Sequence, residues 1–237
     1  MGKSTIAALL VRALHERSGQ VVMAVDADPN SNLGEKLGLI VEHTIGELRE
    51  ELLKNVDSVP AGQSKQEYIE YQMRLAMVEG DGVDLLTMGR QEGPGCYCYI
   101  NNILRTFLDV AMDGYEHIVI DNEAGMEHLS RRTTRHMDHL LVVSDNTKVG
   151  AETAARIMQL AIEMRIGVGS STLILNRVQD DVHPTVKKVV QSSDFGHVVI
   201  LPYDKKVEQL ATEGKSLKEL SERDLLFQRV KALAAEL

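Results

Sequence analysis

Short apolar runs rich in β-branched residues recur along the chain, and each run ends in a polar or small residue. Runs that are apolar at nearly every position, rather than at alternate ones, are typical of strands buried on both faces. We therefore predict strands at residues 21–25, 83–88, 117–120, 140–143, 172–175 and 198–201.

Helical patterns lie between most of these strands. In residues 4–17 the apolar side chains recur every three or four positions and form one face. The same spacing predicts helices at residues 103–112, 149–164, 185–190 and 225–237. Alternation of strands and helices predicts the α/β class, with a doubly wound, mostly parallel sheet and helices on both faces. We expect one domain over residues 1–237, with Asn55–Ser64 as a loop within it.

Composition argues against several classes of function. The formal net charge of -9 disfavours a broad surface for nucleic acid phosphates. Aromatic residues make up 4% of the chain and Trp is absent, so a sheet surface that stacks nucleobases is not expected either. No apolar run approaches the roughly 18 residues of a membrane span, and no signal peptide is visible. We therefore expect a cytoplasmic protein that binds neither nucleic acid nor membrane.

Polar residues stand where the predicted strands end. In open α/β sheets, ligands bind at the carboxyl ends of the strands. The first candidates for a site are therefore Asp26, Asp28, Asp121, Asp145, Asn176 and Pro202–Asp204.

The beginning of the chain carries a phosphate-binding pattern. Gly2-Lys3-Ser4-Thr5 leads directly into a predicted helix, as the end of a Walker A loop does. Amides at a helix N-terminus and a lysine ammonium hold phosphates, and the hydroxyl after the lysine ligates Mg²⁺. An ordinary exposed N-terminus would give the same residues, so the pattern needs support from elsewhere in the chain.

Two acidic segments offer that support. Asp121 closes an apolar strand and is followed by Gly125, which suits a Walker B aspartate that holds Mg²⁺ through water. It equally suits a plain strand end. Asp26–Leu33 follows another strand and contains two acids, a proline and two asparagines. That segment could orient a hydrolytic water or ligate a metal, and it could also be a simple turn, which the same residues favour.

The order of these motifs resembles the deviant-Walker ATPases related to MinD, ParA and the nitrogenase iron protein. The resemblance covers the phosphate loop, Asp-x-Asp-Pro, Asp-x-x-x-Gly, Asn-Arg and Leu-Pro-Tyr-Asp. It implies ATP hydrolysis with Mg²⁺ by a P-loop homodimer that binds nucleotide at its interface. The implied catalytic residues are Lys3, Asp28, which would position the attacking water, and Asp121, which would hold Mg²⁺ with Ser4. Nucleotide contacts would come from Gly2, Lys3, Ser4, Thr5, Asn176, Arg177, Pro202, Tyr203 and Asp204.

Cys96 and Cys98 form a second candidate site. Thiolates bind soft or borderline ions such as Ni²⁺ and Zn²⁺, but two thiolates are too few for a closed tetrahedral site. A symmetric dimer would bring two pairs together across its two-fold axis and supply four sulfurs. Gly93, Pro94 and Gly95 suit a loop that presents the pair at a surface. The alternative is that both cysteines are small apolar core residues.

The segment around the cysteines carries a more specific resemblance. Gly93–Asn101 together with Asp121–Leu129 is similar to the carbon monoxide dehydrogenase maturation factors, which are nickel-insertion ATPases of the same superfamily. The resemblance implies carbon monoxide dehydrogenase as the client. Two other functions stay open: a MinD- or ParA-type regulator that binds membrane or DNA, and an electron-transfer ATPase with a bridging iron–sulfur cluster.

The start of the chain departs from this pattern. A P-loop protein has a strand before its glycine-rich loop, and here Met1 stands inside that loop. We therefore expect an N-terminally truncated chain whose first strand is missing. The phosphate cradle would lack amides, and two neighbouring strands would lack a ladder partner. We expect poor ATPase activity from this chain for that reason.

Overall fold

The computed structural model describes residues 2–54, 62, 65–90, 114–123 and 136–237. Both cysteines lie outside the described residues, as do Gly125 and the predicted helix 103–112. The same is true of most of the predicted loop 55–64. The site at Cys96 and Cys98 therefore stays a prediction from the sequence.

Helices and strands alternate along most of the described chain. In order they are α1 (Lys3–Ser18), β1 (Val22–Asp26), α2 (Leu33–Leu37), α3 (Ile45–Lys54), α4 (Lys65–Leu75), β2 (Val78–Gly80), β3 (Val83–Thr87), β4 (Ile118–Asp121), β5 (His136–Asp145), α7 (Lys148–Glu163), β6 (Gly167–Val178), α8 (Pro184–Gln191), β7 (His197–Pro202), α9 (Lys205–Thr212), the 3₁₀ helix η2 (Leu217–Glu219) and α10 (Leu225–Glu236).

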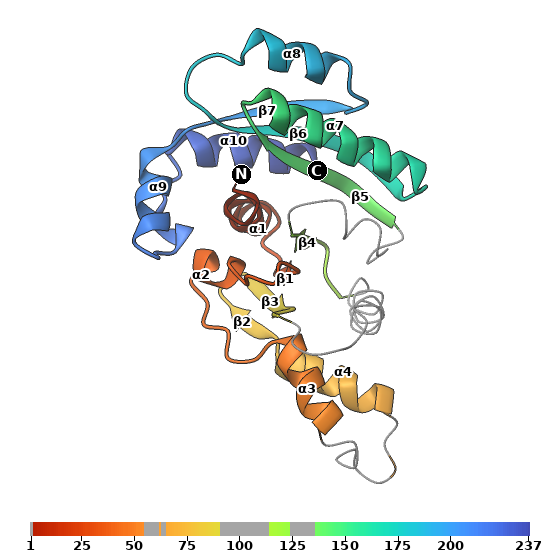
Figure 1. The fold of residues 1–237 in the computed structure, drawn as a ribbon. Coiled ribbons are helices and arrows are strands. Elements are labelled where there is room, and N and C mark those ends of the chain that lie inside the picture. The colour runs from red at the N-terminus through yellow and green to blue at the C-terminus, as the bar shows by residue number, and fades with distance from the viewer. Residues whose placement is uncertain (1, 55–61, 63–64, 91–113, 124–135) are drawn as a thin grey trace.

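The described strands are divided between two sheets (Figure 1). One sheet has the order β2-β3-β1-β4 and the other has the order β5-β6-β7. Every pairing is parallel except that of β2 with β3. The prediction of an α/β fold with mostly parallel strands is confirmed, and each of the six predicted strands overlaps an observed one. In the described part of the chain the strands form two sheets instead of the one predicted, with the division between β4 and β5.

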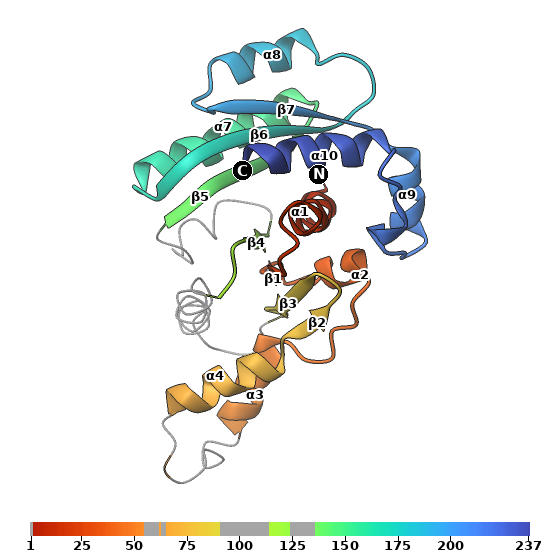
Figure 2. The ribbon, with the colours of Figure 1, turned by 180° about the vertical axis from the view of Figure 1, so that it is seen from behind.

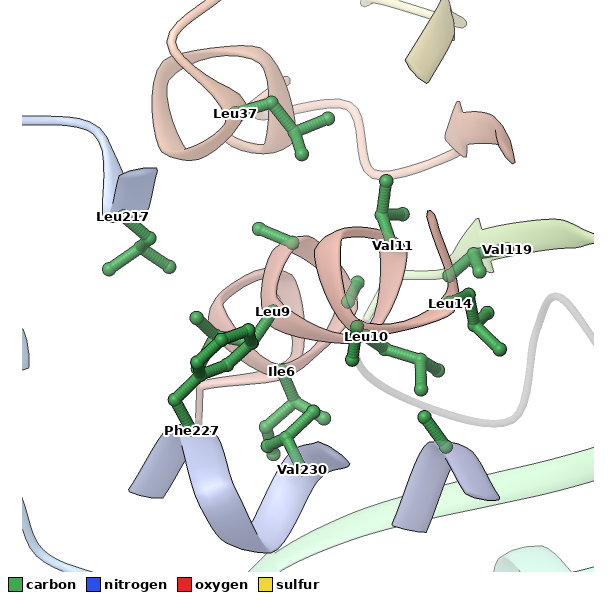
Figure 3. Close-up of a cluster of buried hydrophobic side chains, with 14 of the residues drawn as sticks. Ile6, Leu9, Leu10, Val11, Leu14, Leu37, Val119, Leu217, Phe227 and Val230 are labelled. Atoms are coloured by element: carbon green, nitrogen blue, oxygen red, sulfur yellow. The ribbon is translucent and has the colours of Figure 1, made fainter. Parts of the chain in front are cut away.

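Helix α1 lies between the two sheets and packs against strands of both (Figures 1 and 2). Its fully buried Leu9 belongs to a core that also takes in Val119 of β4 and Leu141 of β5. Helix α10 packs against α1 and contributes Phe227 and Val230 to the same cluster, which Figure 3 shows in close-up. Burial of apolar surface stabilises the folded state by about 25 cal/mol per Å². This shared core therefore holds α1 against strands of both sheets.

Other helices cover the opposite faces of the sheets. Met23 of β1 packs in a second cluster with Ile45 of α3 and Met73 of α4. A third cluster joins Leu173 of β6 to Ala154 of α7 and to residues of α8. Helices on both faces are therefore confirmed. No helix in the described ranges is both long and apolar enough to cross a membrane.

Candidate nucleotide site

The amino end of α1 lies at the carboxyl ends of strands from both sheets. Gly2 precedes the helix with a φ of 90°, in the left-handed region that glycine adopts without steric cost. A Cβ on Gly2 would stand 2.7 Å from the side-chain nitrogen Nδ2 of Asn176, near the end of β6. The N-cap residue Gly2 has no side chain to cap α1, and the first turn of the helix has no acidic residue. The N–H groups of this 16-residue helix therefore offer an uncapped, partially positive end.

Three buried polar side chains form a row beside that helix end. Thr87, Asp26 and Asp121 are the last residues of β3, β1 and β4, and the strand register pairs Asp26 with both of the others. All three are almost completely buried. Since residues paired in register on neighbouring strands point to the same face of a sheet, the row faces α1, as Val119 two positions before Asp121 does.

Asp121 is in contact with the start of α1. The Ser4 side chain hydrogen-bonds to its carboxylate, and the charge of Lys3 acts on it. Burial raises the pKa of Asp121, and the nearby charge of Asp28 adds to that rise, whereas Ser4 and Lys3 lower it. The structure thus brings together Lys3, Ser4, Asp28 and Asp121, four of the residues that the sequence nominated.

Two atoms of the row lack a hydrogen bond among the described residues. They are Oδ2 of Asp121 and Oγ1 of Thr87, and both are buried. A buried polar atom without a partner costs about 1–3 kcal/mol, so native proteins rarely leave one unless water, an ion or a ligand completes the site. The unpartnered carboxylate oxygen suits a hard cation such as Mg²⁺.

The loop after β1 is held by its own acidic side chains. Asp26 accepts hydrogen bonds from the backbone N–H of Leu33 at 2.8 Å and of Asp28 at 3.2 Å. Oδ1 of Asp28 accepts from both the backbone and the side-chain nitrogen of Asn30, each at 2.9 Å. Ser31 follows with a positive φ of 51°. The segment is therefore a turn, which was one of the two predicted alternatives, and the charge of its second acid also acts on Asp121. Its predicted role toward water or a metal stays a prediction.

Asp26 is the more strongly perturbed acid of the loop. Burial is the main cause that raises the pKa of Asp26 to about 6, and the charge of Asp121 adds to it. The two backbone hydrogen bonds to its carboxylate lower the pKa but do not offset the burial. Ionisation of a buried acid at the end of β1 costs free energy. Because strongly perturbed acids are frequent at functional sites, the row is a candidate functional site.

Asn176 and Arg177 lie at an irregularity of β6. The register between β6 and β7 shifts between Leu175 and Val178, and Arg177 has a positive φ of 59°. Bulges of this kind re-aim side chains and are frequent beside active sites. Asn176 is buried against Gly2, whereas Arg177 is exposed. Asn176 is thus placed beside the start of α1, and its predicted adenine contact stays a prediction.

The segment Pro202–Asp204 joins β7 to α9. Pro202 ends β7, and the backbone N–H of Tyr203 donates to the carbonyl of Val178 at 2.9 Å. Asp204 caps α9 by accepting from the N–H groups of Lys206 and Val207, at 2.8 and 3.1 Å. The cap is a structural role that the sequence analysis did not assign to Asp204.

Sequence reasoning missed Thr87. It ends an apolar strand just as Asp26 and Asp121 do, and this position was the available signal. Threonine is also a common strand residue, so its identity alone did not point to a site.

Among the described residues no group of three or more His, Cys, Asp or Glu is arranged to hold a metal ion.

Comparison with known proteins identifies the chain's relatives. The family model of the CobQ/CobB/MinD/ParA nucleotide binding domain matches residues 1–217. An uncharacterized ATP-binding protein of Methanocaldococcus jannaschii is 38% identical over 239 residues, covering 100% of this chain and 94% of the relative. The carbon monoxide dehydrogenase accessory protein CooC of Rhodospirillum rubrum is 30% identical over 233 residues, covering 93% of this chain and 87% of the relative.

Solved structures agree with these relatives at the level of the fold. A ParA family ATPase from Chlorobium tepidum has a TM-score of 0.71 and 19% sequence identity, with 99% of this chain and 92% of that chain covered. At this identity the likeness concerns the fold alone.

Proposed function

We propose that this chain, which belongs to the CobQ/CobB/MinD/ParA nucleotide-binding family, is an ATP-hydrolysing switch that delivers nickel to a carbon monoxide dehydrogenase. The observation that carries the switch is the meeting of Lys3, Ser4 and Asp121 at the uncapped end of α1. The similarity to CooC, together with Cys96 and Cys98, supports the metal and the client.

The described residues fit a nucleotide and its magnesium ion. The α1 amides after Gly2 and the Lys3 ammonium would hold phosphate oxygens. The Ser4 hydroxyl and the unpartnered Oδ2 of Asp121 would hold Mg²⁺, which when bound neutralises charge on the transferred phosphoryl group. Oδ1 of Asp28 is already engaged by Asn30, so its other oxygen is the one that would orient the attacking water.

The same loop offers a route from nucleotide state to conformation. Asp26 holds the N–H of Leu33, which is the first residue of α2. A change in charge at Asp121 acts on Asp26 and Asp28 together, because all three carboxylates influence one another. In this proposal, binding and hydrolysis of ATP reposition the segment 26–33, and α2 moves with it.

The metal half of the proposal assigns the cargo to Cys96 and Cys98. Two thiolates from each subunit of a homodimer would give the four sulfurs that one tetrahedral ion requires. Closure of the dimer around nucleotide would assemble this site, so metal affinity and nucleotide state would be thermodynamically linked. Opening after hydrolysis would release the ion to the client enzyme.

A metal titration with and without ATP tests the proposal. The double variant Cys96→Ser/Cys98→Ser should lose stoichiometric binding of Ni²⁺ and Zn²⁺ while it retains the nucleotide affinity of the wild type. Asp28→Ala is the matched control: it should keep metal and ATP binding and slow ATP turnover. Metal stoichiometry that is unchanged in the double variant would rule out delivery from this site, and an unchanged turnover in Asp28→Ala would rule out its role.

A regulator of the MinD or ParA type is the second candidate, and the family match is equally consistent with it. Against membrane binding by the C-terminal helix, α10 uses its apolar residues within the core: Phe227, Val230 and Leu233 are buried against other elements. Co-sedimentation with anionic liposomes and with DNA, in ATP and in ADP, separates the two functions. ATP-dependent sedimentation with either partner would favour the regulator.

A further inference from the structure

A cavity of about 60 Å³ lies on the flank of α1. Its walls come from α1, α2, the turn between β2 and β3, and η2, and no residue assigned to the nucleotide site lines it. Most of the lining is apolar: Leu9, Leu37 and Leu217, which Figure 3 labels, are each almost completely buried. Since one water needs about 10–15 Å³ of cavity, there is room for roughly four to six non-hydrogen atoms.

The charged residues at this cavity are mostly basic. Arg12, Lys36 and Lys218 line it against one described acid, Asp81, whereas the whole chain has a formal net charge of -9. Arg12 already binds Glu16 at 2.8 Å. Lys36 and Lys218 form no ion pair with any described residue. Two unpaired ammonium groups beside an apolar wall suit an anion that carries an apolar chain.

Helix α2 joins this cavity to the loop that follows β1. At the start of α2, Asp26 accepts a hydrogen bond from the N–H of Leu33 at 2.8 Å. At its other end, Oγ of Ser216 donates to the carbonyl oxygen of Lys36 at 3.3 Å, and Ser216 caps η2. The charge of Lys36 also acts on Asp121. One short helix therefore contacts the acidic row at one end and the cavity at the other.

We propose that this cavity binds a short-chain monocarboxylate and that the bound acid holds α2 against α1 and η2. The carboxylate would bind the ammonium groups of Lys36 and Lys218, and its hydrocarbon chain would cover Leu9, Leu37 and Leu217. Acids from acetate to butyrate have the roughly four to six non-hydrogen atoms that the volume admits. Because α2 follows the loop 26–33, occupancy would also change the affinity for nucleotide, a consequence that rests on the proposed function.

An NMR titration of the nucleotide-free chain with sodium butyrate, at constant ionic strength, tests the site. The neutral probe 1-butanol has the same chain length and lacks the charge. Butyrate should bind saturably with a Kd on the order of 1 mM, and at least about tenfold more tightly than 1-butanol, because hydrogen bonds to the charged carboxylate add to burial of the chain. The amide shifts should centre on residues that line the cavity.

Two lysine variants distinguish this site from a general effect of charge. Lys36→Gln/Lys218→Gln should bind butyrate and 1-butanol with affinities within about threefold of each other, since only the apolar contacts remain. Lys215→Gln is the matched control, because Lys215 is close to Lys218 in sequence, does not line the cavity and binds Glu213 at 2.7 Å. It should keep the wild-type affinity for butyrate.

Amide hydrogen exchange measures the effect on α2. Butyrate at about ten times its Kd should slow exchange over residues 33–38 by at least about threefold, whereas the buried strand β6 should exchange as before. Both measurements are made without nucleotide, so their outcome does not depend on whether the chain hydrolyses ATP.

Three results would overturn the proposal. Butyrate that binds no more tightly than 1-butanol would mean that the cavity is a packing void without an anion site. Equal loss of affinity in Lys215→Gln and in the double variant would mean that butyrate responds only to the net charge of the surface. Saturable binding that leaves exchange over residues 33–38 unchanged would show that the acid does not hold α2.

Discussion

Replacement of Asp26 by Asn should change how the stability of the empty protein depends on pH. Burial raises the pKa of Asp26 from its ordinary value of 3.8 to about 6. Between these pH values the folded state holds a proton that the unfolded state has lost, so wild-type stability falls as the pH rises through this window. Asn cannot titrate, and it is close in shape to the protonated acid. The unfolding free energy of the variant should therefore not fall with pH through the titration of this residue.

The magnitude follows from the interval between the two pKa values. A rise from 3.8 to about 6 corresponds to about 3 kcal/mol of unfolding free energy, fully lost once the pH exceeds about 6. The Asn side chain has one acceptor oxygen for two backbone donors, Leu33 and Asp28. This mismatch adds a cost of about 1–3 kcal/mol at every pH. The informative quantity is therefore how the difference in unfolding free energy between variant and wild type changes with pH. The size of that difference at a single pH does not test the assignment.

Urea denaturation from pH 4 to pH 8 in EDTA, without nucleotide, measures this change. The unfolding free energy of Asp26→Asn minus that of the wild type should rise by about 2.4 kcal/mol between pH 4 and pH 7, because the unfolded acid is already partly ionised at pH 4. Asn30→Ala is the control, because it alters the same loop without removing a titrating group. A difference for Asp26→Asn that stays constant across this range would refute the assignment of a costly buried carboxylate to Asp26.

Two further substitutions test the packing and the site boundary by urea denaturation. Phe227→Ala should lower the unfolding free energy by about 3–5 kcal/mol, because its ring is completely buried and has the Arg12 guanidinium 4.1 Å from its centroid; a loss under about 1 kcal/mol would contradict the core described for α1 and α10. Asp204→Ala should cost about 1 kcal/mol through loss of the α9 cap, and Asp204→Asn should restore it; equal losses in both variants would argue against the cap.

Six of the described strands were predictable because each contains a short, nearly continuous apolar run, although the outer strand β7 is largely exposed. Val22–Asp26 is buried at all five positions, and such a strand leaves a continuous pattern in the sequence. Helices α3, α4 and α9 were missed for the opposite reason. Their residues are mostly polar, and α9 has a single buried residue, Leu210. The cap at Asp204 was the signal for α9, but the resemblance had already assigned that residue to adenine.

The residues of the candidate site also fall into those that sequence motifs predict and those that only tertiary packing places. Lys3, Ser4 and Asp121 could be brought together from the sequence because each belongs to a motif with a fixed place at the end of a strand or the start of a helix. Thr87 was missed because a threonine at the end of a strand is a weak signal, and the register of β3 on β1 is what places it beside Asp26. The position of Asn176 against Gly2 depends on the tertiary packing of α1 beside β6, which no local pattern reveals.

The nucleotide site and the division of the sheets meet at the same residues. Ser4 contacts a strand of the first sheet through Asp121, while Gly2 contacts the second sheet through Asn176. The distance between the two sheets therefore determines whether the first turn of α1 can contact both of them. A phosphate held by that turn would contact both sheets at once. Nucleotide affinity and the separation of the two sheets should consequently be coupled, because both depend on holding the same two ends of the fold around one helix terminus.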